Sequence, residues 1–120
     1  MAKIVYIAHP VGEDVGKNIK SILKILREIH LSGLDVVPFA PYLTALQYLN
    51  DHVPEERKLG MSVNRLFFEK KIIDELWLAG PAISKGMEEE IRLSLAKGIP
   101  IKCYNPGLEP ELKKLIETSR

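Results

Sequence analysis

The sequence lacks the features that would mark a nucleic-acid-binding, secreted or membrane protein. Its 17 basic and 16 acidic residues leave a formal net charge of +1, which gives no electrostatic case for binding nucleic acid or anionic membranes. No apolar run approaches the roughly 18 residues of a membrane span. The opening MAKIVYIAHP lacks the length and cleavage site of a signal peptide. We therefore expect a cytoplasmic protein that begins with a strand.

Several catalytic and metal-binding patterns are also missing. Cys103 is the single cysteine, so an internal disulfide is excluded, and its place in an expected buried strand favours a structural thiol. His9, His30 and His52 are widely separated and there is no CxxC pair, so we predict no metal site. The chain has no GxxxxGK[ST], GxGxxG or GxSxG, which argues against Walker-type, dinucleotide-binding and serine-hydrolase sites. We expect no cofactor.

What the chain does contain is an alternation of strand and helix patterns. With 46% hydrophobic and 28% charged residues it reads as one globular domain over residues 1–120. Strands are expected at 3–8, 35–39, 76–79 and 99–104, and helices at 15–29, 54–70, 86–97 and from 108 onward. Residues 42–52 fit either a short helix or an ordered loop over a pocket. The order predicts an α/β three-layer sandwich with a parallel sheet of four to five strands, flavodoxin-like or Rossmann-like.

Ligands of such folds bind at the carboxyl ends of the strands. That edge would collect His9, Pro10 and Gly12 after the first strand, residues 40–42 after the second, and residues 80–86 after the third. Gly86 begins a helix beside Ser84. Its backbone N–H groups could hold an anion, or Ser84 could simply cap the helix.

The stretch from Asp74 to Pro100 reads as strand, loop, helix and entry to another strand. Three glutamates occupy the first turns of its helix, where carboxylates complement the helix dipole. That role suffices for Glu89. Glu90 instead lies on the flank of the apolar stripe, under a glycine-containing loop, where a functional carboxylate is an alternative to the dipole role. On geometry alone, Asp74 fits a surface position at the strand start, and Tyr6 fits core packing.

These segments together resemble the nucleoside 2-deoxyribosyltransferase superfamily, including its nucleoside 5′-monophosphate N-glycosidase branch. The resemblance lies in VYIAHP at 5–10, ERKLGM at 56–61 and DELWLAGPAISKGMEEEI at 74–91. It implies that Glu90 is the nucleophile, that Tyr6 orients it, and that Asp74 is the family's acid at the strand start. It also implies a substrate-binding set, comprising His9, Pro10, Asn18, Gly80, Ser84, Gly86 and Met87.

Two positions depart from the transferase pattern. Ser84 stands where the transferases carry an aspartate, six residues before the nucleophile, as in the related hydrolases that bind a 5′-phosphate. Leu66 stands where the family has an aspartate on the preceding helix, which puts proton handling at the leaving base in question. The resemblance implies cleavage or transfer at the N-glycosidic bond of a nucleoside or nucleotide. A nucleotide-binding module without turnover and a structural interaction domain remain alternatives.

The chain is also expected to form a homo-oligomer, at least a dimer. Short chains bury a smaller fraction of their surface than long ones. Apolar side chains gather in one expected loop, namely Tyr42, Leu43, Leu46, Tyr48 and Leu49. This segment could be an interface or could fold back as a lid over its own sheet. The helix with Leu66, Phe67 and Phe68 offers apolar residues on more than one side.

Overall fold

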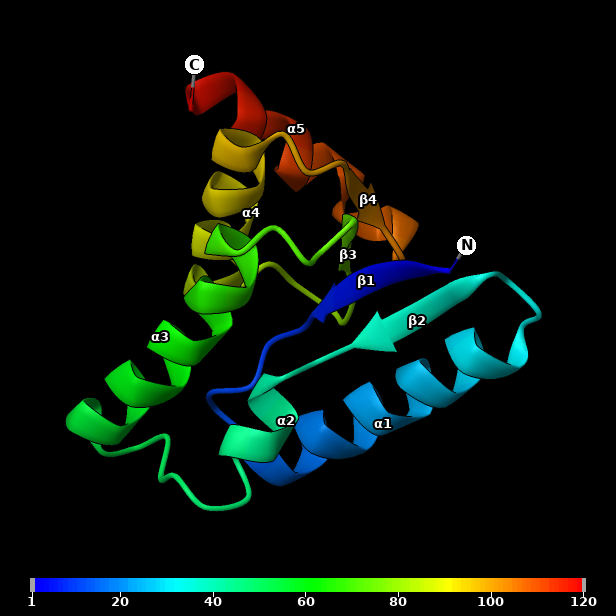
Figure 1. The fold of residues 1–120 in the computed structure, drawn as a ribbon. Helices are drawn as coiled ribbons and strands as arrows, with labels where there is room; N and C mark the ends of the chain where they lie inside the picture. The colour runs from blue at the N-terminus through cyan, green and yellow to red at the C-terminus, as the bar shows by residue number, and fades with distance from the viewer. Residues whose placement is uncertain (1, 120) are drawn as a thin grey trace.

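A four-stranded parallel sheet forms the centre of the protein (Figure 1). The structure is a computed structural model that describes residues 2–119. The strands are β1 (Lys3–Ala8), β2 (Val36–Phe39), β3 (Glu75–Leu78) and β4 (Ile101–Cys103). Their order is β2-β1-β3-β4, and every neighbouring pair is parallel. The expected parallel α/β sheet is confirmed, with four strands.

Helices cover both faces of this sheet. They are α1 (Val15–Leu31), α2 (Tyr42–Ala45), α3 (Pro54–Glu69), α4 (Lys85–Lys97) and α5 (Glu109–Thr118), the last preceded by the 3₁₀ turn η1 (Pro106–Leu108). Helix α1 packs on one face, over β1 and β2, and α3, α4 and α5 pack on the other (Figure 1). The three layers expected from the sequence are therefore present. None of these helices is long and apolar enough to cross a membrane.

Alternation along the strands explains why both faces are apolar. Tyr6 and Leu76 point into the larger core with α3, α4 and α5, whereas Val5 and Ile7 point toward Ile29 of α1. Because side chains of a strand alternate between faces, a continuous apolar run in β1 serves both layers at once. This is the pattern of a strand that is covered on both sides.

The face of β3 and β4 beside α1 carries charge instead of a helix. The Glu75 carboxylate is buried and accepts hydrogen bonds from Lys3 Nζ at 2.8 Å and Trp77 Nε1 at 2.9 Å, with Lys102 Nζ at 3.0 Å. Burial by itself raises the pKa of this carboxyl, but these three donors outweigh it and lower the pKa to about 2. The carboxylate therefore ties three strands together at one end of the sheet.

Residues 42–52 fold back over their own sheet. Tyr42 and Ala45 are buried, and the Tyr42 hydroxyl donates to the carbonyl of Ile7. Leu43 and Leu46 pack against the core, so most of the apolar side chains proposed for an interface are already covered. Tyr48, at 71% exposure, is the exception. Of the two alternatives for this segment, an interface or a lid, the structure shows the lid, because the Tyr42 hydroxyl bonds to β1 of the same chain.

Candidate functional site

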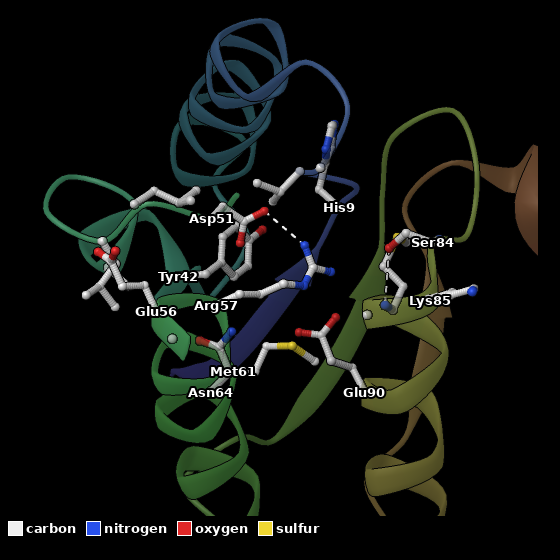
Figure 2. A pocket seen from close by; sticks show the side chains of 18 residues that line it. His9, Tyr42, Asp51, Glu56, Arg57, Met61, Asn64, Ser84, Lys85 and Glu90 are labelled. Atoms are coloured by element: carbon white, nitrogen blue, oxygen red, sulfur yellow. Dashed lines mark hydrogen bonds and ion pairs between the residues drawn. The ribbon is translucent and has the colours of Figure 1, made fainter. Parts of the chain in front are cut away.

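A cavity of about 170 Å³ opens at the carboxyl end of the sheet. In the strand order β2-β1-β3-β4, the connections from β1 and from β3 run to opposite edges of the sheet, so the topological switch point lies between β1 and β3. Open α/β sheets bind ligands at this position. Residues from the loop after β1, from α2 and α3, and from the first turns of α4 surround it (Figure 2). Its lining comprises His9, Val11, Gly12, Tyr42, Ala45, Leu46, Leu49, Asp51, Glu56, Arg57, Gly60, Met61, Asn64, Ser84, Lys85, Gly86, Met87 and Glu90.

Glu90 supplies the carboxyl group on the α4 side of this cavity. Met87, Ile91 and Ser94 bury one stripe of α4, and Glu90 lies on the flank of that stripe, as the helical spacing predicts. Figure 2 shows its carboxyl pointing toward the α3 side chains Arg57 and Met61. Burial raises the pKa of Glu90 to about 8, the Tyr6 hydroxyl opposes this rise, and Glu89 adds to it.

The residue as a whole is only half-buried, because its carboxyl opens into the cavity. Water in the cavity moderates the rise, but its direction is set by the apolar surroundings of the group. The carboxyl therefore favours its protonated form near neutral pH. Since α4 begins at Lys85, Glu90 lies beyond the first turn, where the helix dipole is weak.

Tyr6 lies directly behind Glu90, fully buried in the middle of β1. Its ring contacts Phe68 and Tyr42 at centroid distances of 4.9 and 5.9 Å. Within residues 2–119 its hydroxyl has no partner that meets hydrogen-bond geometry, yet it faces the Glu90 carboxyl closely enough for each group to shift the other's pKa. Burial, and then Glu90, raise the pKa of Tyr6 well above its usual value, so the hydroxyl keeps its proton. Core packing and contact with Glu90 therefore occur together.

The first turn of α4 forms the next part of the wall. The Ser84 hydroxyl caps the helix by accepting from the Met87 N–H at 3.2 Å, and the Ser84 carbonyl accepts from the Glu88 N–H. No hydrogen bond of the described residues uses the N–H groups of Lys85 and Gly86, both of which line the cavity. Capping and anion binding are therefore compatible here, since the cap leaves the first two amides of the helix unused.

Hydrogen bonds within the loop after β1, and from this loop to α1, hold the cavity wall in place. His9 faces the cavity, but its ring is held in place: Nδ1–H donates to the Pro10 carbonyl at 2.7 Å, and Nε2 accepts from Ser21 at 2.9 Å. Burial lowers the pKa of His9, which keeps it neutral and in this tautomer. Asn18 donates to the Val11 carbonyl at 3.0 Å and lies outside the cavity lining.

Gly80 does not line the cavity either, but it lets the two loops meet. Its φ is +84°, and a Cβ built there would lie 2.8 Å from Pro10 Cδ and 2.9 Å from the His9 ring. Pro10 and Gly80 therefore shape the site through this close approach and not through the cavity surface. Neither residue lines the cavity, so the structure does not place Pro10 and Gly80 in the substrate contact expected of them.

Asp74 is separated from the cavity by the length of a strand. It immediately precedes β3 and accepts from the Ile4 N–H at 2.7 Å, at the amino end of the sheet. Glu90 lies at the opposite, carboxyl end. A direct part for Asp74 in catalysis is therefore wrong for this structure. Asp74 instead occupies the strand-start position expected from its spacing, because β3 separates its carboxyl from that of Glu90.

Helix α3 contributes residues that the sequence reasoning missed. Arg57 points into the cavity and pairs with Asp51 at 3.0 Å (Figure 2). Asn64 lies near Glu90, and its buried Oδ1 has no hydrogen-bond partner among the described residues. Leu66, the position aligned with the family's helix aspartate, is 45% exposed on the other side of α3. The ERKLGM segment at 56–61 was the available signal, since four of its residues, Glu56, Arg57, Gly60 and Met61, line the cavity.

Residues 2–119 contain no cluster of side chains that could hold a metal ion. No three side chains of the histidine, cysteine, aspartate or glutamate type converge there. The polar side chains that line the cavity include those of Glu90, Asn64, Ser84, Glu56, Lys85 and the Asp51–Arg57 pair. They suit the recognition of an organic ligand with hydrogen-bonding edges.

A protein family described as a domain of unknown function, DUF7768, matches residues 3–104. The chain belongs to this family. The match spans the whole sheet and every residue that lines the cavity of this DUF7768 domain. No curated protein shows significant similarity to it.

A solved structure that is similar to the DUF7768 domain is that of a conserved protein from Enterococcus faecalis V583. The two chains share 22% sequence identity with a TM-score of 0.60. The similarity covers 86% of this chain but only 63% of the bacterial protein, so the DUF7768 domain spans less than two thirds of that neighbour's length. At this identity the likeness bears on the fold alone.

Proposed function

We propose that this protein cleaves or transfers the N-glycosidic bond of a (deoxy)nucleoside or nucleoside 5′-monophosphate, with Glu90 as the nucleophile. The observation that carries the proposal is the placement of Glu90 against the Tyr6 hydroxyl in a cavity whose next wall is the first turn of α4. The sequence resemblance to nucleoside 2-deoxyribosyltransferases points to the same two residues. The proposal includes a cytoplasmic setting and needs no cofactor.

In this reaction a carboxylate oxygen of Glu90 attacks C1′ of the sugar. A C1′–O bond forms as the C1′–N bond breaks, and the bonding electron pair leaves with the base. Water then releases the sugar from the glutamyl ester, or a second base accepts it, as in two-step retaining glycoside hydrolysis. Tyr6 would orient the carboxylate, and Ser84 with the free amides of α4 would hold the sugar or its 5′-phosphate.

The departing base would meet the α3 side of the cavity. Arg57 and Asn64 can donate N–H groups to its ring nitrogens or carbonyl oxygens. Neither group gives up a proton near neutral pH, so the base would take its proton from solvent. This arrangement favours bases that are stable as anions. Protonation of the base by solvent would also make an acidic side chain at position 66, where this chain has Leu66, unnecessary.

The raised pKa of Glu90 gives the proposal a pH signature. Only the ionised carboxylate can attack C1′, and the free protein holds it protonated below about pH 8. We expect kcat/KM for base release to rise about tenfold per pH unit below this pKa and to level off above it. A rate that falls above pH 8 would instead mean that Glu90 acts as a general acid.

The direct experiment measures base release from a panel of nucleosides and 5′-monophosphates by liquid chromatography. Glu90→Ala is expected to remove all release while the protein stays folded, and Glu89→Ala is the matched control on the neighbouring position. Glu89 pairs with Arg65 away from the main cavity but adds to the rise in the pKa of Glu90. Its loss should therefore leave turnover nearly unchanged above about pH 8, where Glu90 is ionised with or without it. Wild-type turnover in Glu90→Ala contradicts the proposal.

The second candidate is a nucleotide-binding module without turnover. The protonated state that the cavity favours for Glu90 at neutral pH is the observation on its side. Thermal shift with the same ligand panel separates the two functions. Ligand-dependent stabilisation without released base at any pH supports the binding module, and no shift with any ligand contradicts both.

A further inference from the structure

Helix α3 leaves an apolar stripe facing solvent. Leu59, Val63 and Leu66 are 58%, 45% and 45% exposed. Their spacing of four and three residues puts them on one face of the helix, at about 100° per residue. Asn64 and Phe68 point the opposite way, toward the cavity and the core. The exposure of these three side chains makes the stripe an outer surface of α3 that the protein's own sheet does not cover.

Opposite charges lie at the two ends of this stripe. Glu55 precedes it and Lys70 follows it, both exposed and on the same face. Lys58 and Glu69 repeat the reversal of sign along one flank, and both are exposed. In residues 2–119 none of these four side chains forms an ion pair within the chain.

We infer that this stripe binds the same stripe of a second copy of the chain, with the two α3 helices antiparallel about a two-fold axis between Ser62 and Val63. This register sets Leu59 against the partner's Leu66. It also sets Glu55 against the partner's Lys70, and it brings Lys58 within one turn of the partner's Glu69. Each contact occurs twice, as an isologous interface requires.

The charge pattern selects both the occupant and its direction. A parallel pairing in the same register would place Glu55 on Glu55 and Lys70 on Lys70, which repel. A helix face whose sign reverses about its own midpoint is complementary to itself, so a second copy fits it without any other partner. The interface lies on the side of α3 away from the cavity. Each copy therefore keeps a complete site, and the inference does not depend on the chemistry proposed for Glu90.

Site-specific cross-linking tests the geometry. The natural thiol is first removed as Cys103→Ser, and single cysteines are introduced as Ser62→Cys or Lys70→Cys. Two Ser62 positions lie beside the two-fold axis, so Ser62→Cys should form a disulfide-linked dimer under mild oxidation. Two Lys70 positions lie about 22 Å apart along the paired helices, at 1.5 Å per residue, so Lys70→Cys should stay uncrosslinked. Efficient linkage of Lys70→Cys, or none of Ser62→Cys, overturns the register.

Sedimentation of the full chain tests the association itself. Wild-type protein should show a dimer whose dissociation constant rises at least about tenfold in Leu66→Glu or Lys70→Glu. Adding Glu55→Lys to Lys70→Glu reverses both charges and should restore most of the lost affinity. Leu23→Glu is the matched control, because Leu23 is 54% exposed on α1, away from the stripe.

Three outcomes overturn the inference. One is a wild-type monomer at about 100 µM. The second is a loss of dimer in Leu23→Glu as large as that in Leu66→Glu. The third is a failure of the double charge reversal to recover affinity relative to Lys70→Glu, with thermal melts showing all variants folded.

Discussion

Replacing Glu90 with glutamine is expected to stabilise the folded protein, and the gain should grow with pH. The folded-state pKa of about 8 lies above the ordinary value of 4.5, so between these two values the folded protein holds a proton that the unfolded chain has released. The free energy of unfolding of the wild type therefore falls as pH rises through this window, and the full loss is reached above about pH 8. Glutamine keeps the shape of the side chain and removes the titration.

The size of this effect follows from the burial of the group. At about 1.4 kcal/mol per pKa unit, the full difference would correspond to about 5 kcal/mol for a completely enclosed carboxyl. The Glu90 carboxyl opens into the cavity, where water screens part of this energy, so we expect a gain on the order of 3–4 kcal/mol above pH 8. For a chain of this size that corresponds to a Tm increase of about 12–16 °C.

The assay is a series of thermal melts followed by circular dichroism from about pH 5 to about pH 9. Glu88→Gln, two positions earlier and outside the cavity, is the control and should melt in parallel with the wild type at every pH. If the difference between Glu90→Gln and the wild type does not change across this range, the protonated carboxyl in the cavity is wrong, and the expected pH dependence of base release is wrong with it.

Three further predictions concern the scaffold and the helix cap. Glu75→Gln should lower the free energy of unfolding by about 1–2 kcal/mol at neutral pH. Since the pKa of Glu75 is lowered, that loss should shrink from pH 4.5 toward about pH 2, as urea titrations can show. Gly80→Ala should cost at least about 2 kcal/mol because its Cβ meets Pro10, whereas Gly33→Ala, at the same φ but in open space, should cost about 1 kcal/mol. Ser84→Ala should weaken calorimetric binding of monophosphates more than that of nucleosides; equal losses would leave Ser84 as a cap alone.

The sequence by itself determined the parallel α/β architecture. Alternation of apolar strand runs with helical spacing leaves little other choice, because parallel strands need crossover helices. It also put Glu90 on the flank of its helix, since the period of an α-helix fixes which side chains share a face. Pro38 falls inside the expected second strand at 35–39, although proline cannot donate a backbone hydrogen bond to a neighbouring strand. In the structure it pairs with Val5 on the edge strand β2, where a missing N–H breaks no ladder.

Only the tertiary structure decided which polar residues meet. Asp74 and Glu90 bracket one short segment of chain, yet the length of β3 holds them at opposite ends of the sheet. Asn64 and Arg57 reach the cavity, while Leu66 turns to solvent, because the packing of Phe68 against Tyr6 sets the rotation of α3 about its axis. Local sequence patterns determine which side chains of a helix or strand share a face. The rotation of that helix about its axis and the elements that it packs against are determined by contacts between residues far apart in the chain.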